Sequence, residues 1–225
     1  KPVVVPAGIT PFSGHTRAFV KIQNGCSGTC AYCRIPHYRG RPRSRSREDI
    51  AADISRLVSG QGFREIVITG THIGLYGKEK EGSGQLSFLM NFLAGEFSGC
   101  RFRLSSLEPM EVEDVIDNVI EKSNICPHLH VPLQSGSRRI LRRMRRPYTP
   151  EMFTDILRRI RSRVPDLSVT TDVITGFPGE TEQDFADSVR MVRAFEFSRV
   201  HVFPYSARPG TPAADMDGQV DPGVR

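Results

Sequence analysis

Short runs rich in β-branched and aromatic residues alternate with longer stretches of helical periodicity along this chain, and the alternation repeats six times. Strands that alternate with helices form parallel sheets, because each crossover helix carries the chain back to start the next strand in the same direction. The expected strands are 17–24, 65–70, 101–106, 128–133, 168–176 and 199–206. The expected helices are 47–59, 85–95, 111–122, 136–145, 150–163 and 181–194.

Six such units can form an open doubly wound sheet or an incomplete barrel. The doubly wound dinucleotide-binding fold needs a G-x-G-x-x-G turn after its first strand, whereas the first strand here is followed by a loop with three cysteines. Parallel barrels carry their chemistry on the loops that follow the strands. In this chain those loops are rich in Cys, Ser, Thr, Gln and Glu. We therefore predict an α/β fold, a partial (β/α)6 barrel of the TIM-like kind.

The length of 225 residues suits one large unit better than two domains. The first and last segments are rich in Pro and Gly, and the sequence starts at Lys1 without an initiator Met. We expect residues 1–16 and 207–225 to be linkers to further domains of a longer protein, on either side of a catalytic core at 17–206. No apolar run reaches the roughly 18–20 residues of a membrane span.

Five cysteines are present, and Cys26, Cys30 and Cys33 share one loop with the spacing C-x3-C-x2-C. A secreted disulfide-rich domain would be smaller and denser in cysteine, so we expect a cytoplasmic protein. Three neighbouring thiolates can converge on one metal centre and leave one coordination position open, which is typical of a catalytic site. His37 could instead complete a Cys3His zinc site, and inert buried thiols are a further alternative.

The string GCSGTCAYCRIPHYRGRPRSR, with Tyr32 directly before the third cysteine, resembles the signature of radical S-adenosylmethionine (SAM) enzymes, and most closely that of the methylthiotransferases among them. The resemblance extends over about residues 15–216, in the segments TGTHIGLYG, LSSLEP, CPHLHVPLQSGS, MRRPYT, TTDVITGFPGET and HVFPYSARPGTPA. Within that family, the segments around His72 and Tyr205 are most similar to the branch that modifies threonylcarbamoyladenosine in tRNA. The branches that act on dimethylallyladenosine or on a ribosomal protein are the alternatives.

The resemblance implies a barrel of the radical SAM type and a [4Fe-4S] cluster on Cys26, Cys30 and Cys33, with SAM on the open iron. In this family the reduced cluster cleaves SAM to a 5′-deoxyadenosyl radical. The radical takes hydrogen from C2 of N6-threonylcarbamoyladenosine next to the anticodon, where a methylthio group is then added. A second [4Fe-4S] cluster belongs to an N-terminal domain that this chain lacks. The implied partners are the tRNA anticodon loop and an electron donor such as flavodoxin or ferredoxin, and we expect a monomer.

The remaining strand ends are expected to orient SAM. Asp172 is a charge inside a predicted parallel strand, where side chains are usually apolar, and a buried carboxylate needs a partner. Phe203 could pack on the SAM adenine or simply within the core, and the Ser, Thr and Gly positions could equally form caps and turns. Cys100 and Cys126 are expected to be buried thiols. The expected cofactor-binding residues are Tyr32, Thr69, Gly70, Ser106, Glu108, Gln134, Asp172, Gly176 and Phe203.

The cations are mostly arginine and leave a formal net charge of +6. Arginine presents a planar fork of donors that suits phosphate groups. Two arginine-rich runs, 39–47 and 138–146, follow predicted strands and therefore lie on the catalytic rim, where tRNA has to approach. An ordinary solvated surface is the alternative, and Arg145 could instead reach the SAM carboxylate. The expected RNA-binding residues are Arg39, Arg41, Arg43, Arg45, Arg142 and Arg143.

A function of a different class is also compatible with the sequence: a zinc-stabilised RNA-binding module with Cys26, Cys30, Cys33 and His37 as ligands. Such a module shares the arginine-rich rim with the enzyme but does not use SAM. Anaerobic reconstitution with iron and sulfide separates the two, because only the enzyme becomes brown and cleaves SAM.

Overall fold

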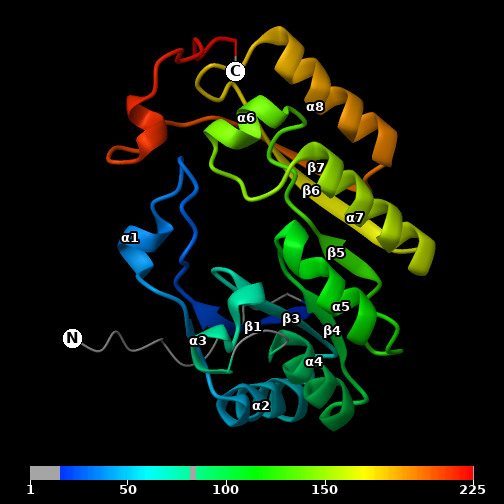
Figure 1. Cartoon of the computed structure of the whole chain (residues 1–225). Helices are drawn as coiled ribbons and strands as arrows, with labels where there is room; N and C mark the ends of the chain where they lie inside the picture. Colours follow the sequence, from blue (N-terminus) through cyan, green and yellow to red (C-terminus); the bar gives the residue numbers. More distant parts are fainter. Residues whose placement is uncertain (1–15, 82–84, 225) are drawn as a thin grey trace.

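The computed structural model of the chain describes residues 16–81 and 85–224. Figure 1 shows a curved sheet with helices along its outer side. The strands that follow one another around this curve are β1 (Arg17–Asn24), β3 (Glu65–Gly70), β4 (Arg101–Leu104), β5 (His128–His130), β6 (Ser168–Thr175) and β7 (Arg199–Pro204). The expected linker at 1–16 lies, apart from Thr16, outside the described residues.

These six strands run parallel to one another and follow one another in chain order. β1 pairs with β3 and β3 with β4, and β5 pairs with β6 and β6 with β7. Between β4 and β5 the sheet continues only through isolated parallel bridges, Phe102 to Ile125 and Ser106 to His130. Sequential order around an arc is what repeated right-handed β/α units produce. The predicted α/β partial barrel is confirmed.

One face of the sheet forms the core. Val20 and Ile22 of β1 and Ile66 and Ile68 of β3 are buried and pack in the same cluster as Ile54 of α2 (Arg47–Ser55). Full burial of such a side chain contributes about 1.5–3 kcal/mol. Because neighbouring residues of a strand point to opposite faces, the intervening side chains are left on the concave face, away from the helices.

The predicted helices are all present, and their local start signals act as expected. Thr149 accepts a hydrogen bond from the Met152 N–H ahead of a first-turn proline, and Thr181 forms a capping box with Asp184. The remaining long helices are α4 (Gln85–Glu96), α5 (Val112–Asn118), α6 (Arg138–Arg143), α7 (Pro150–Arg163) and α8 (Glu182–Phe195).

Several elements differ from the prediction. β4 and β5 end two and three residues early, and Pro132, which has no N–H to donate, lies just beyond β5. The first long helix finishes in a π-helical turn at Arg56–Gly60. The prediction lacked several short elements, among them α1 (Ile35–Arg39), α3 (Lys78–Glu81) and the strand β2 (Arg43–Ser44), which is antiparallel to β1.

The C-terminal segment, expected to be a linker, packs against the barrel as far as it is described. Ala213 lies in a short 3-10 helix, Pro212–Asp215, and its N–H donates to the Ala31 carbonyl at 2.9 Å. Ala213 is buried together with Phe177 and Tyr205. This segment therefore contributes to the surroundings of the cysteine loop. Within the described part of the chain, no helix combines the length and apolarity needed to cross a bilayer.

Candidate functional site

The cysteine loop leaves the carboxyl end of β1 and returns to the sheet as β2. The two strands pair through Gln23 with Ser44 and Asn24 with Arg43. At the start of the loop, the Cys26 N–H donates to the Gly40 carbonyl at 3.1 Å. This pairing closes the loop into a compact unit at the edge where a parallel barrel carries its functional groups.

Each of the three loop thiols is only partly exposed and faces at least one N–H donor. The Sγ of Cys26 lies 3.2 Å from the Gly28 nitrogen and 3.5 Å from Nδ1 of His72, and the Sγ of Cys33 lies 3.4 Å from the Ile35 nitrogen. The hydrogen bond with His72 lowers the pKa of the Cys26 thiol. Donors of this kind stabilise thiolates, which are the forms that bind metals.

The third thiol, that of Cys30, is held by a buried arginine. A guanidinium nitrogen of Arg146 lies 3.1 Å from the Cys30 sulfur. The same guanidinium forms an ion pair with Glu108 and lies 3.2 Å from the hydroxyl of Tyr148. Burial raises the pKa of Cys30, and the positive charge of Arg146 opposes this effect. The sequence singled out Arg145 for an inward role, whereas the structure turns Arg146 inward.

The thiols are not arranged around a single ion. In a tetrahedral zinc site with Zn–S bonds of about 2.3 Å, neighbouring sulfurs lie about 3.8 Å apart. Among the described residues, the one group of three or more His, Cys, Asp or Glu ligand atoms within 4.8 Å of one another is His130, Asp172 and His201. His37 is exposed on α1 and stacks edge-on against Tyr38. The Cys3His zinc alternative is therefore not formed.

A cluster of several irons, each bound by one cysteine, fits this wider arrangement. Gly28 lies between two of the ligands: a Cβ at this position would stand 3.2 Å from the sulfur of Cys26 and 3.9 Å from that of Cys30. The absence of a side chain keeps the space between the thiols open. By contrast, Cys100 and Cys126 are buried in the core, as expected.

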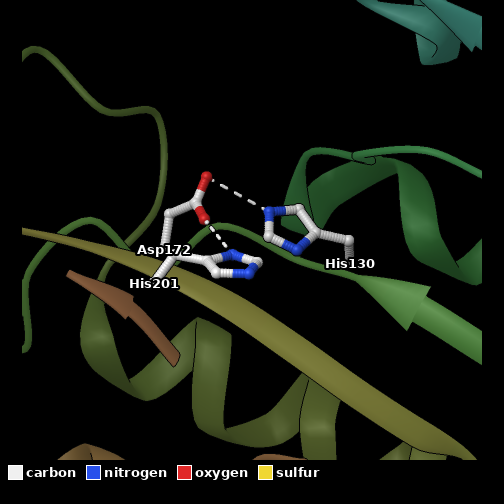
Figure 2. Close-up of side chains that lie close together, drawn as sticks. All are labelled: His130, Asp172 and His201. Atoms are coloured by element: carbon white, nitrogen blue, oxygen red, sulfur yellow. Dashed lines mark hydrogen bonds and ion pairs between the residues drawn. The ribbon is translucent and has the colours of Figure 1, made fainter. Parts of the chain in front are cut away.

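Asp172 has two partners on the concave face of the sheet, shown in Figure 2. Its two carboxylate oxygens lie 3.1 Å from Nε2 of His130 and 3.1 Å from Nδ1 of His201, which come from the neighbouring strands β5 and β7. These two hydrogen bonds lower the pKa of Asp172, although burial acts in the opposite direction. The expectation that this carboxylate needs a partner is confirmed. The three groups satisfy one another, so the arrangement requires no ion.

The other expected cofactor residues lie at or just beyond the strand ends. Thr69 and Gly70 close β3, and Ser106 is exposed next to β5. Gln134 adopts a left-handed backbone conformation (φ 62°) and runs alongside β6: its N–H donates to the Asp172 carbonyl, and its carbonyl accepts from Ile174, both at 2.8 Å. Glu108 is engaged with Arg146, as described above.

The end of β6 is built around aromatic contacts. The Gly176 N–H donates to the Glu180 carboxylate at 2.5 Å. Phe177 is fully buried, with the ring of Tyr32 at 6.2 Å and the ring of Tyr205 at 5.3 Å between centroids, both edge-on. Phe203 is 51% exposed. Tyr32 and Tyr205 therefore pack against Phe177, whereas Phe203 presents exposed aromatic surface.

The expected RNA-binding arginines fall into two groups. Arg39, Arg41, Arg43 and Arg142 are exposed. Arg45 is not: its side chain is 12% exposed, forms an ion pair with Asp53 at 2.6 Å and donates to the Lys21 carbonyl at 3.0 Å. This guanidinium therefore anchors α2 to β1, and Arg45 offers fewer free donors to RNA than its exposed neighbours.

The side chain of Arg143 is also partly occupied by contacts within the protein. It donates to the Pro178 carbonyl at 3.0 Å and forms an ion pair with Asp217 at 3.0 Å. The arginines of the first run lie two residues apart, so alternation along a strand does not separate them, and Arg45 differs because Asp53 of α2 lies beside it. In the second run, the turn of α6 gives neighbouring arginines different exposure. The arginine-rich runs of the sequence alone do not predict which arginines are exposed and which are bound within the protein.

Two residues of the site, His72 and Glu111, were not predicted from the sequence to contact each other or the cysteine loop. Nε2 of His72 lies 2.9 Å from a carboxylate oxygen of Glu111, while its Nδ1 faces Cys26. Although burial opposes a charged imidazole, the hydrogen bonds with Cys26 and Glu111 raise the pKa of His72 to about 9. The only sequence signal was the position of His72 in a motif, and nothing marked Glu111.

Comparison with known proteins places this arrangement in a family. Residues 20–192 match the radical SAM superfamily. The chain is 44% identical over 219 residues to the threonylcarbamoyladenosine tRNA methylthiotransferase MtaB of Bacillus subtilis (strain 168), covering 96% of this chain and 48% of that protein. It is also 44% identical over 214 residues to a tRNA-2-methylthio-N(6)-dimethylallyladenosine synthase of Parafrankia sp. (strain EAN1pec), covering 94% of this chain and 43% of that protein. The chain thus spans about half the length of these relatives.

Solved structures show the same fold at low sequence identity. The radical SAM methyltransferase TsrM of Kitasatospora setae, with cobalamin and a [4Fe-4S] cluster bound, superposes with a TM-score of 0.71 at 16% identity, over 88% of this chain and 38% of that one. Methylornithine synthase (PylB) gives a TM-score of 0.65 at 16% identity, over 91% and 58%. With the partial barrel and the loop of three cysteines, the match over residues 20–192 shows that the chain belongs to the radical SAM superfamily.

Proposed function

We propose that this chain is the catalytic core of a radical SAM tRNA methylthiotransferase, in which Cys26, Cys30 and Cys33 hold a [4Fe-4S] cluster. The observation that carries the proposal is the cysteine loop: three thiols at the carboxyl edge of the barrel, each facing a hydrogen-bond donor and spaced too widely for one ion. When bound, the cluster supplies the electron for reductive cleavage of SAM. Relatives named as tRNA methylthiotransferases support the same class of reaction.

The residues around the loop suit the functional groups of SAM. Asp172 lies on the concave face with carboxylate lone pairs left after its two histidines, so it can accept from a ribose hydroxyl. Glu108 carries the negative charge that an ammonium group needs, and Phe203 offers an exposed ring for the adenine. Tyr32 is proposed to contact SAM through its ring. The other proposed contacts come from polar backbone or side-chain groups of Thr69, Gly70, Ser106, Gln134 and Gly176.

The proposed substrate is N6-threonylcarbamoyladenosine next to the anticodon of a tRNA, modified at C2. The relatives are named for two different nucleosides, and the segment around His72 favours threonylcarbamoyladenosine over dimethylallyladenosine. Arg39, Arg41, Arg43 and Arg142 are exposed near the site and suit RNA phosphates, with Arg143 partly available.

The complete reaction needs parts outside this chain. We assign the second [4Fe-4S] cluster to an N-terminal domain of the longer protein, since the chain spans about half of its relatives. Flavodoxin or ferredoxin is the proposed electron donor, because the cluster requires a low-potential reductant. The proposed enzyme acts as a monomer in the cytoplasm, where its tRNA substrate is.

Anaerobic reconstitution of the full-length protein with iron and sulfide tests the cluster. The expected product is a brown protein that converts SAM to 5′-deoxyadenosine after reduction, and Cys30→Ala should abolish this cleavage without loss of the fold. A colourless protein that binds zinc and leaves SAM intact contradicts the proposal.

Mass spectrometry of tRNA nucleosides from cells that lack the gene tests the substrate. Loss of 2-methylthio-N6-threonylcarbamoyladenosine alone supports the proposed nucleoside. Loss of the dimethylallyl derivative instead assigns the chain to the other branch, and unchanged tRNA with an unmodified ribosomal protein assigns it to the third.

A further inference from the structure

A chain of polar contacts leads from the first cysteine of the loop into the protein. The sulfur of Cys26 lies 3.5 Å from Nδ1 of His72, and Nε2 of the same ring lies 2.9 Å from Glu111. Lys78 reaches the same Glu111 oxygen at 3.6 Å. The side chains of His72 and Glu111 are 18% and 11% exposed, so water competes little with these contacts.

The surrounding backbone holds both members of the pair in place. The His72 N–H donates to the side chain of Gln23 at 2.9 Å, and Gln23 is completely buried beside the cysteine loop. Glu111 accepts from the Glu108 N–H at 3.2 Å, as part of the capping box that starts the following helical turn. Gly74 leaves the space that the Glu111 carboxylate occupies, since a Cβ there would overlap it. The pair is therefore built into the fold rather than formed by two free surface side chains.

Hydrogen-bond accounting defines what the imidazole does. Glu111 accepts from the Glu108 N–H and forms an ion pair with the Lys78 ammonium, and an ionised carboxylate can only accept from His72. A cysteine that binds a cluster is a thiolate and also acts only as an acceptor. An imidazole between two acceptors donates from both nitrogens, and one of these N–H groups points at the Cys26 sulfur.

We propose that His72, oriented by Glu111, is a positioning residue that donates a hydrogen bond to the sulfur of Cys26 and thereby raises the reduction potential of the cluster. The inference rests on the proposed function, which puts the cluster on this cysteine. Hydrogen bonds to cluster sulfurs set reduction potentials, because they stabilise the additional negative charge of the reduced state. Groups that orient metal ligands also typically change metal affinity by 10–100-fold when they are removed.

The test uses the reconstituted full-length protein and two readouts besides activity. EPR-monitored redox titration of the signal that changes when SAM is added gives the midpoint potential of the cluster on Cys26, Cys30 and Cys33. The decay of the same signal in the presence of an iron chelator gives the retention of that cluster. His72→Phe keeps a ring of similar size but has no donor, so the midpoint potential should move to a more negative value and iron loss should become roughly 10–100-fold faster. His72→Asn, which retains a side-chain N–H, should restore part of the midpoint potential and part of the iron retention.

His37→Phe is the matched control, because His37 is an exposed histidine of the same loop region that contacts none of these groups, and its potential should equal that of the wild type. His72→Ala replaces His72→Phe if the larger ring prevents folding, as judged by circular dichroism, and the same shift is expected.

A folded donor-less variant with wild-type potential and iron retention overturns the inference while the proposed function stands. Failure of the wild-type protein to bind any [4Fe-4S] cluster overturns the proposed function, and this inference with it.

Discussion

The guanidinium of Arg146 lies 3.1 Å from the sulfur of Cys30, a residue 116 positions earlier in the sequence. The side chain of Arg146 is only 4% exposed and also forms an ion pair with Glu108. One buried cation therefore joins the loop after β1, the segment after β4 and the end of α6. This contact links the position of a cluster ligand to the closure of the barrel.

Replacing Arg146 with Met should release Cys30 and leave Glu108 without its cation. Loss of one partner of a buried pair is expensive because the other charge stays desolvated, and we expect the free energy of unfolding to fall by roughly 3 kcal/mol. Urea unfolding of the apoprotein measures this change. The double variant Arg146→Met/Glu108→Gln should recover part of the stability, and a double variant no more stable than the single one would contradict the pairing.

Gly74→Ala should disturb the site although it removes no polar side chain. The new Cβ overlaps the Glu111 carboxylate, so Glu111 has to move away from His72. Overpacking of this kind typically lowers the free energy of unfolding by about 1–3 kcal/mol. Thermal unfolding measures the loss, with Gly95→Ala as the control, since a Cβ at Gly95 meets no atom within 4 Å. Equal melting temperatures for the two variants would show that the space at Gly74 is not used.

Arg41 and Arg45 are expected to behave differently although both belong to the first arginine run. Arg41→Ala removes an exposed cation and should weaken tRNA binding and reduce its salt dependence by about one phosphate contact. Arg45→Ala instead removes the ion pair with Asp53 and should lower stability. Filter binding at several salt concentrations and urea unfolding separate the two effects. An unchanged salt slope for Arg41→Ala would argue against its contact with RNA.

Asp184 should stabilise the contact between α6 and α8. Its carboxylate accepts from the hydroxyl of Ser137 at 2.6 Å and from the N–H of Thr181 at 2.9 Å, and it pairs with Arg139. Although burial opposes the charge, these partners lower the pKa of Asp184. Its contribution is therefore complete above the unfolded pKa near 4 and is lost as pH falls further, through the folded pKa.

Asp184→Asn measures this contribution. The variant should be less stable than the wild type by roughly 2 kcal/mol at pH 7, a value typical of lost hydrogen bonds to a charged group, and the difference should shrink at pH 3. Urea unfolding at both pH values checks the expectation. A difference that stays constant between the two would mean that the carboxylate charge contributes nothing.

His128 should make the fold sensitive to mild acid. Burial and the nearby charge of Arg103 lower the pKa of His128 to about 4, and its Nδ1 is buried without a hydrogen-bond partner. The unfolded chain binds a proton at this histidine below about pH 6.5, whereas the folded chain binds it only near pH 4. Stability should therefore fall as pH decreases from 6.5 to 4. His128→Asn should show a shallower decrease in urea unfolding over this range, and identical slopes would contradict the assignment.

The sequence by itself determined the elements and the cysteine loop. Helices such as α7 and strands such as β1 follow from periodicity, caps and prolines, which act within a few residues and can be read locally. The C-x3-C-x2-C spacing likewise brings three thiols together within one loop. The proposed cluster ligands could therefore be named before the fold was known.

Only the tertiary structure decided which polar groups meet. Arg45 is covered while Arg41 faces solvent because Asp53 on α2 reaches Arg45, and the meeting of Asp172 with His130 and His201 depends on the register of three strands. The contacts of His72 and Arg146 with the loop thiols span 46 and 116 residues. No local pattern encodes such distances, because they arise only when the crossover units close around a common core.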